Sequence, residues 1–180
     1  MFDSQAGLDA CNDKDFRKIY DATMPILFRI AWRIAGTEDA AEDLCHDALI
    51  KMTEKAMQFP SINDAKYWLI RVVKNASLNY AKRKTRERKA YERALREEKR
   101  VMESGETRLL KEDAVRQVQA ALEELPENLR SVLQLKEYGE MNYKDIGQTL
   151  GITEGNVKVR VFRAREQLSK LIEEEDVYVP

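Results

Sequence analysis

The sequence has 180 residues, of which 43% are hydrophobic and 35% are charged, a composition typical of a folded protein and not of a disordered chain. Its 7 Gly and 4 Pro residues are few, which argues against many strands joined by tight turns. No apolar run reaches the roughly 20 residues of a membrane span, and the first residues do not resemble a secretory signal. We therefore expect an all-α protein that stays in the cytoplasm without membrane insertion.

Two cysteines, Cys11 and Cys45, and one histidine, His46, are present. They are too few for a disulfide framework or a zinc site. The sequence also lacks a catalytic triad pattern and a Gly-rich phosphate loop. We expect no metal, no cofactor and no enzymatic activity, and we interpret Cys45 and His46 as an interface or buried pair.

The net charge of −1 hides an uneven distribution. Residues 66–100 hold 13 Lys and Arg against 4 Asp and Glu, whereas both flanking segments are acidic. A concentrated basic segment is typical of a nucleic-acid-binding surface, but a solvated charged helix has the same composition. The charge pattern alone therefore leaves both interpretations open.

Apolar residues at helical spacing predict two packed helices near the start of the chain. The first covers residues 16–34 and ends at Gly36, and the second runs from about Asp39 to residue 59. Asp39 stands three residues before Glu42, which is the spacing of a capping box. Residues 60–64 then predict a loop.

A long helix is predicted from Ala65. Trp68 shares its apolar face with Leu69 and Val72, so a core position is favoured over base stacking for this tryptophan. The opposite face offers polar and basic side chains, namely Arg71, Lys74, Asn75, Asn79 and Lys82.

We predict two small helical domains, residues 1–86 and 107–180, joined by a flexible charged linker at residues 87–106. The second domain begins with an apolar stripe that includes Val118 and Leu122 and that predicts a separate core.

Residues 142–168 have the pattern of a helix-turn-helix. Asn142 can cap a helix whose third residue is Asp145, Gly151 permits a sharp turn, and Thr153 can cap the next helix. Val157 and Val161 mark the buried stripe of that second helix. The turn chemistry and the apolar spacing agree, so we predict a DNA-reading unit, with a hairpin packed on another protein as the alternative.

The face opposite the stripe would enter the major groove. Lys158 and Arg163 can donate to guanine, and Asn156 can pair with adenine. Val159 or Phe162 can contact a thymine methyl group. Arg160 and Arg165 flank the apolar stripe, at positions where phosphates of the DNA backbone would lie. The predicted DNA-reading residues are Asn156, Lys158, Val159, Arg160, Phe162, Arg163 and Arg165.

With these motifs in place, the chain resembles the extracytoplasmic-function sigma factors of bacterial RNA polymerase. In the second domain the resemblance rests on residues 121–126, 143–147, 150–158 and 160–165. In the first domain it rests on Ala41-Glu42-Asp43-Leu44 with His46-Asp47, and on Trp68-Leu69-Ile70-Arg71 with Lys74-Asn75. The order of the motifs along the chain also matches that of the family.

The resemblance implies three binding surfaces and the partners core RNA polymerase, promoter DNA and an anti-sigma factor. The second domain would read the minus-35 element through the residues named above. The first domain would bind core polymerase through Asp43, Leu44, His46, Asp47 and Ile50. It would also recognise and melt the minus-ten element through Asn63, Arg71, Lys74, Asn75, Lys82, Arg83 and Lys84.

Four positions differ from the family pattern. Ala40 and Asn79 stand where the family often has Asp, His46 stands where Gln is frequent, and Gly147 stands where Ala is usual. A stand-alone helix-turn-helix regulator is the alternative function, and it predicts a dimer. That alternative leaves the basic helix and the motif at residues 41–47 unexplained.

Overall fold

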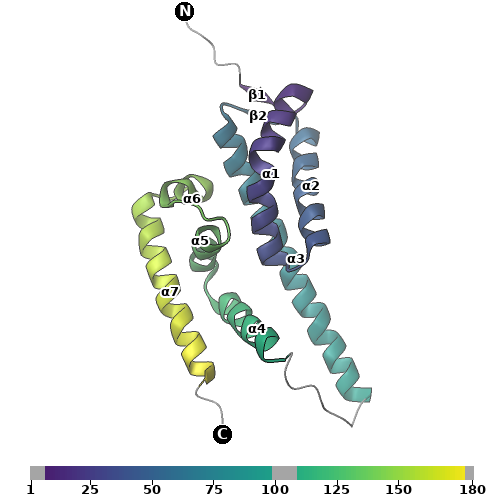
Figure 1. The fold of residues 1–180 in the computed structure, drawn as a ribbon, viewed down its shortest axis with the longest axis vertical. Coiled ribbons are helices and arrows are strands. Elements are labelled where there is room, and N and C mark those ends of the chain that lie inside the picture. Colours follow the sequence, from purple (N-terminus) through teal and green to yellow (C-terminus); the bar gives the residue numbers. More distant parts are fainter. Residues whose placement is uncertain (1–6, 99–108, 177–180) are drawn as a thin grey trace, which may run out of the picture.

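The computed structural model describes residues 7–98 and 109–176, and the described part is almost entirely helical, as predicted. Two units are visible in Figure 1. The first contains β1 (Leu8–Asp9), α1 (Asp13–Ala35), α2 (Glu38–Glu54), β2 (Gln58–Phe59) and α3 (Ile62–Glu98). The second contains α4 (Leu109–Glu124), α5 (Glu127–Glu137), α6 (Tyr143–Leu150) and α7 (Glu154–Asp176).

Helix α1 has a well-defined signal at each end. The Asn12 side chain accepts hydrogen bonds from the backbone amides of Lys14 and Asp15, at 3.0 and 3.2 Å. Gly36 follows the helix with φ of 82°, a left-handed conformation that glycine adopts without steric penalty. The predicted end of the first helix at Gly36 is therefore confirmed.

Helix α2 departs from the prediction at both ends. Its N-cap is Thr37, which makes no side-chain capping bond, so the predicted capping box of Asp39 and Glu42 is wrong. Asp39 already lies in the first helical turn and cannot take the extended cap conformation. The helix ends at Glu54, because Ala56 has a φ of 45° and the chain then turns into β2.

Helix α3 begins earlier and ends later than predicted. Ser61 accepts a hydrogen bond from the Asp64 amide at 3.3 Å and donates one to the Asp64 carboxylate at 2.6 Å. This reciprocal pair starts the helix at Ile62, inside the predicted loop. The helix then runs to Glu98 through the first part of the predicted linker. The other linker residues, 99–108, lie outside the described part of the chain.

The apolar core of the first unit lies where α1, α2 and α3 meet. Leu27 and Ile30 of α1 pack with Leu69 and Ile70 of α3, and all four are fully buried. Trp68 is half-buried against the same core, with its ring 6.1 Å from that of Phe59. The preference for a core position of Trp68 is thus confirmed.

The second unit does not have a fully separate core. Val132, Leu135 and Ile146 belong to the same apolar cluster as the buried residues of α1 and α3. A smaller cluster around Leu122 holds α4, α5 and α7 together. The prediction of a buried Val118 is wrong, because this side chain is 40% exposed. The two units therefore pack against each other.

No helix within the described ranges is both long and apolar enough to cross a bilayer.

The Asn12 cap gives a direct test of the first unit. Asn12→Ala should lower the free energy of unfolding by about 1 kcal/mol, because two backbone amides of α1 lose their acceptor. Chemical denaturation followed by circular dichroism measures this loss. Thr37→Ala is the matched control, since Thr37 caps α2 without a side-chain hydrogen bond. Equal losses for the two variants would contradict the capping role of Asn12.

Candidate nucleic-acid interface

Helices α6 and α7 form the predicted helix-turn-helix. Asn142 accepts a hydrogen bond from the Asp145 amide at 2.8 Å, and Thr153 accepts one from the Asn156 amide at 3.3 Å. Gly151 ends α6 with φ of 69°. These three predictions are confirmed, and together they fix the angle at which α7 leaves the turn.

The tight packing around Gly147 gives a reason for one departure from the family pattern, in which Ala is usual at this position. A Cβ atom placed at this position would lie 2.7 Å from the backbone oxygen of Ile152. The Ile152 amide also donates to the carbonyl of Gly147 at 3.0 Å. The turn therefore closes so tightly onto α6 that a larger side chain would force the backbone to move.

Helix α7 separates an apolar side from a polar side. Val157, Val161 and Ala164 are at most 2% exposed and face the core. On the other side Phe162 is 70% exposed and Val159 is 49% exposed, so the predicted DNA-reading face carries two large apolar side chains in contact with solvent. The polar neighbours on this side, Asn156, Lys158 and Arg163, are exposed as well.

Two basic residues of α7 are already paired with carboxylates. Lys158 lies 3.0 Å from Glu154, and its ammonium group also lies 5.9 Å from the centre of the Tyr143 ring. Arg165 lies 2.6 Å from Glu137 of α5. The hydrogen bond from Arg165 to Glu137 raises the pKa of the arginine. Arg160 is half-buried beside the exposed face.

Helix α3 divides its predicted DNA-binding residues between two environments. Asn63, Asn75, Lys82, Arg83 and Lys84 are exposed. The guanidinium group of Arg83 lies 5.6 Å from the centre of the Tyr80 ring, and the ammonium group of Lys84 lies 5.8 Å from it. These residues form the accessible part of the basic helix.

Lys74 and Arg71 contact the second unit instead. Lys74 is only 4% exposed, and its ammonium group donates a hydrogen bond to Ser131 Oγ at 2.9 Å. Arg71 Nε donates to the carbonyl of Thr149 at 2.7 Å, although the residue keeps an exposed surface. Burial lowers the pKa of Lys74, because the charged ammonium group loses its solvation. The prediction that Lys74 lies on an open face is therefore wrong in this conformation.

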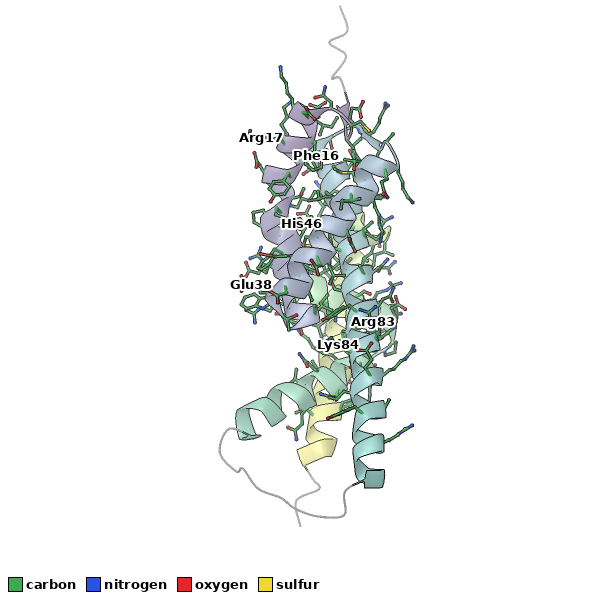
Figure 2. The ribbon with its side chains drawn as sticks, turned by 90° about the vertical axis from the view of Figure 1, so that its right-hand side faces the viewer. Phe16, Arg17, Glu38, His46, Arg83 and Lys84 are labelled. Atoms are coloured by element: carbon green, nitrogen blue, oxygen red, sulfur yellow. The ribbon has the colours of Figure 1, made fainter. Side chains whose placement is uncertain are left out.

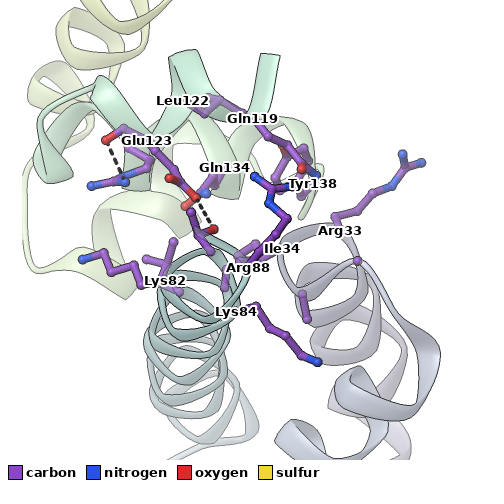
Figure 3. A pocket seen from close by; sticks show the side chains of 16 residues that line it. Arg33, Ile34, Lys82, Lys84, Arg88, Gln119, Leu122, Glu123, Gln134 and Tyr138 are labelled. Atoms are coloured by element: carbon purple, nitrogen blue, oxygen red, sulfur yellow. Dashed lines mark hydrogen bonds between the residues drawn. The ribbon is translucent and has the colours of Figure 1, made fainter. Parts of the chain in front are cut away.

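Three further contacts between the units could not be predicted from the sequence. The Tyr67 hydroxyl donates to the Asp145 carboxylate at 2.8 Å. Burial and this hydrogen bond raise the pKa of Tyr67 to about 12. Arg29 pairs with Glu140 at 2.7 Å. Thr85 donates to Glu123 at 3.3 Å beside a cavity of about 300 Å³ that lies between α1, α3, α4 and α5 (Figure 3).

The predicted polymerase-binding residues lie along α2. Asp43, His46, Asp47 and Ile50 are exposed, and Leu44 is half-buried. Figure 2 shows His46 on the side of the first unit that is turned away from the second unit. Ile50 is 52% exposed, which places an apolar side chain among polar ones. These residues recur at helical spacing and so share one surface.

Cys45 does not pair with His46. Cys45 is buried whereas His46 is exposed. Burial raises the pKa of the Cys45 thiol to about 12, and Glu42 adds to the shift, so the reactive thiolate is scarce at neutral pH. In the described part of the chain, no three His, Cys, Asp or Glu side chains are grouped as metal ligands.

Comparisons with known proteins identify the family. Residues 19–87 match the model of "Sigma-70 region 2", and residues 115–168 match that of "Sigma-70, region 4". The chain is 31% identical to the ECF RNA polymerase sigma factor SigM of Mycobacterium tuberculosis over 146 residues, 81% of this chain and 71% of the relative. It is 30% identical over 148 residues to the ECF sigma factor SigE of Mycolicibacterium smegmatis, which covers 79% of this chain but only 55% of that relative.

A solved structure is similar along most of the chain. The sigma factor RpoE of Bartonella quintana, crystallised with the anti-sigma factor NepR, matches with a TM-score of 0.50 and 25% identity. The match covers 89% of this chain and 98% of that one. The chain therefore belongs to the extracytoplasmic-function sigma factors, a non-catalytic family that directs RNA polymerase to promoters. This membership argues against the stand-alone regulator.

The ion pair between Arg165 and Glu137 generates a test of the interface. Glu137→Gln should strengthen binding to duplex DNA about two- to fivefold at low salt, because Arg165 becomes available to a phosphate. The dependence of log affinity on log salt should steepen by up to about 0.9. Fluorescence anisotropy with a labelled duplex measures both quantities.

Glu166→Gln is the matched control for this test. Glu166 pairs with Lys170 on the same helix at 3.0 Å, and neither residue belongs to the predicted DNA-reading face. The control should bind duplex DNA no more than slightly tighter than the wild type. The same gain in both variants would indicate a general charge effect and would contradict a phosphate contact by Arg165.

Proposed function

We propose that this sigma factor binds its promoter with two separate surfaces. The exposed side of α7 reads the minus-35 element, and the basic side of α3 holds the nontemplate strand of the minus-ten element. The observation that carries the proposal is the exposed face of α7, where Phe162 and Val159 stand among hydrogen-bonding side chains. Such a mixture of apolar and polar groups suits the floor of the major groove.

The role of α3 is supported by its charge and shape. Lys82, Arg83 and Lys84 are consecutive and exposed, and Asn75 lies two turns before them on the same helix. Separated strands are bound by basic tracks with adjacent polar or aromatic groups. Asn63, in the first turn of α3, is placed to contribute to the same strand at the other end of the helix.

Core polymerase would bind α2. The exposed Ile50 supplies apolar contact, and Asp43, His46 and Asp47 supply polar anchors. This mixed composition fits an interface that forms and dissociates repeatedly. In domain terms, residues 1–86 bind polymerase and the minus-ten element, residues 107–180 read the minus-35 element, and residues 87–106 connect them.

An anti-sigma factor is the remaining proposed partner. The similar sigma factor RpoE of Bartonella quintana was crystallised in complex with the anti-sigma factor NepR. We extend that type of partner to this chain on the basis of their similarity along most of both chains. The site of action is the cytoplasm, where RNA polymerase and the chromosome are accessible.

Run-off transcription tests the proposed function. The chain mixed with a bacterial core polymerase should initiate transcription from a subset of a random promoter library, because both promoter surfaces then act together. Core polymerase alone is the control. Absence of stimulation, combined with tight unaided binding of the chain to a palindromic duplex, would support a stand-alone regulator instead.

Two substitutions separate base reading from phosphate binding. Arg163→Ala should lose about 1–3 kcal/mol of discrimination at particular minus-35 bases, because a guanine contact disappears. Lys82→Ala should weaken binding to all sequences alike and reduce the salt slope by about 1. Competition assays with the polymerase holoenzyme on a set of promoter variants measure both effects. Equal losses on every minus-35 sequence for Arg163→Ala would refute its reading role.

A further inference from the structure

The cavity of about 300 Å³ between α1, α3, α4 and α5 has the charge of an anion site. Among the lining residues that the structure describes, five are Lys or Arg and one, Glu123, is acidic. The Glu123 carboxylate already accepts a hydrogen bond from Thr85 at 3.3 Å. Small-molecule sites have volumes of ~300–1,000 Å³, so this cavity suits a small anion.

Arg130 of α5 lines the cavity as a poorly compensated cation. It is only 8% exposed, and its Nη1 donates to the backbone carbonyl of Glu123 at 3.2 Å. Its Nε is buried and has no hydrogen-bond partner, and no carboxylate in the described part of the chain pairs with it. A buried charge is stable when an opposite charge or several hydrogen bonds replace its water. The planar fork of N–H donors of an arginine matches the oxygens of a phosphate.

Gln134 lines the cavity one helical turn farther along α5. It is 6% exposed, and its buried Oε1 also has no hydrogen-bond partner among the described residues. Because an amide oxygen only accepts, its partner must be a hydroxyl or an N–H group. Residues four apart share one side of a helix, so Arg130 and Gln134 would bind different parts of the same ligand.

The remaining walls complete a mixed polar and apolar site. Tyr138 lines the cavity with Gln134 (Figure 3), and burial raises the pKa of Tyr138, so its hydroxyl stays protonated at neutral pH and can donate. Leu78 and Ala81 of α3 and Leu122 of α4 supply apolar surface. A small ring with hydroxyl groups can pack against such a surface while its polar atoms form hydrogen bonds.

We propose that the cavity binds a small phosphate ester with hydroxyl groups, either a sugar phosphate or a mononucleotide. The phosphate binds Arg130 and supplies the negative charge that this guanidinium lacks. A hydroxyl of the ligand donates to Gln134. Neither residue belongs to the proposed promoter contacts, so the ligand site and the promoter-binding function can fail independently of each other.

Isothermal titration calorimetry of the full chain tests the site with four probes, namely ribose phosphate, adenosine monophosphate, adenosine and inorganic phosphate. At least one of the two esters should bind with one-to-one stoichiometry and about tenfold or more tightly than adenosine or inorganic phosphate, since each of these lacks one of the two contacts. Tighter binding of ribose phosphate indicates a sugar phosphate, and tighter binding of adenosine monophosphate indicates a nucleotide. No saturable binding of either ester at millimolar concentration would overturn the proposal. So would equally tight binding of inorganic phosphate.

Removal of the buried charge tests the phosphate contact. Arg130→Met should weaken ester binding about tenfold or more. Arg17→Met is the charge-matched control, because Arg17 is exposed (Figure 2) and lies about 24 Å along α1 from the cavity-lining Arg33. The control should bind the ester like the wild type. Equal weakening in both variants would indicate a general charge effect and would refute the site.

An internal competitor for Arg130 gives a second test in a folded chain. Gln134→Glu places a carboxylate one turn from Arg130, where it takes the position of the ligand phosphate. The variant should lose ester affinity about tenfold or more. Its melting temperature should not fall, because Arg130 gains a partner of opposite charge. Unchanged ester affinity in Gln134→Glu, with the melting temperature maintained, would overturn the assignment of the site to Arg130 and Gln134.

Discussion

The packing of α3 against α1 is the contact on which the other surfaces depend. Leu69, Ile70 and Val73 of α3 are fully buried, and they meet an apolar side of α1 that includes Leu27 and Ile30. This packing fixes the rotation of α3 about its own axis. The polar sides of the helix are thereby assigned, one to the second unit and another to solvent. Any change that rotated α3 would move every proposed minus-ten residue at once.

The proposed polymerase-binding and DNA-binding surfaces of the first unit adjoin each other. A surface groove between α2 and α3 is lined by Asp43 and Asp47 on one side and by Arg83 and Lys84 on the other. Acidic and basic side chains thus line the same groove. Among the described residues, no ion pair joins Asp43 or Asp47 to Arg83 or Lys84. A protein partner and a DNA strand bound here would lie close together, so binding of one would affect the electrostatic field felt by the other.

The features that could be predicted from sequence are those whose causes are local. Asn142, Gly151 and Thr153 each act on backbone within three residues, and the helix-turn-helix was therefore predictable residue by residue. Ser61 is equally local, and its three-residue spacing to Asp64 was a usable signal for the start of α3. The burial of Lys74 was not predictable, because its partner Ser131 lies 57 residues away and a serine in an amphipathic helix has no distinguishing pattern. Such contacts depend on how two complete units fit together.

The uninterrupted course of α3 has a consequence for the energetics of DNA recognition. The helix has 37 residues, so it is a rod about 55 Å long at 1.5 Å per residue. Its basic segment, residues 82–89, therefore has a fixed spacing of charges before any ligand arrives. A flexible basic tail would lose conformational freedom when it aligned with a strand. Here that ordering is already complete in the free protein, so phosphate contacts made by this segment have a smaller entropic penalty to overcome.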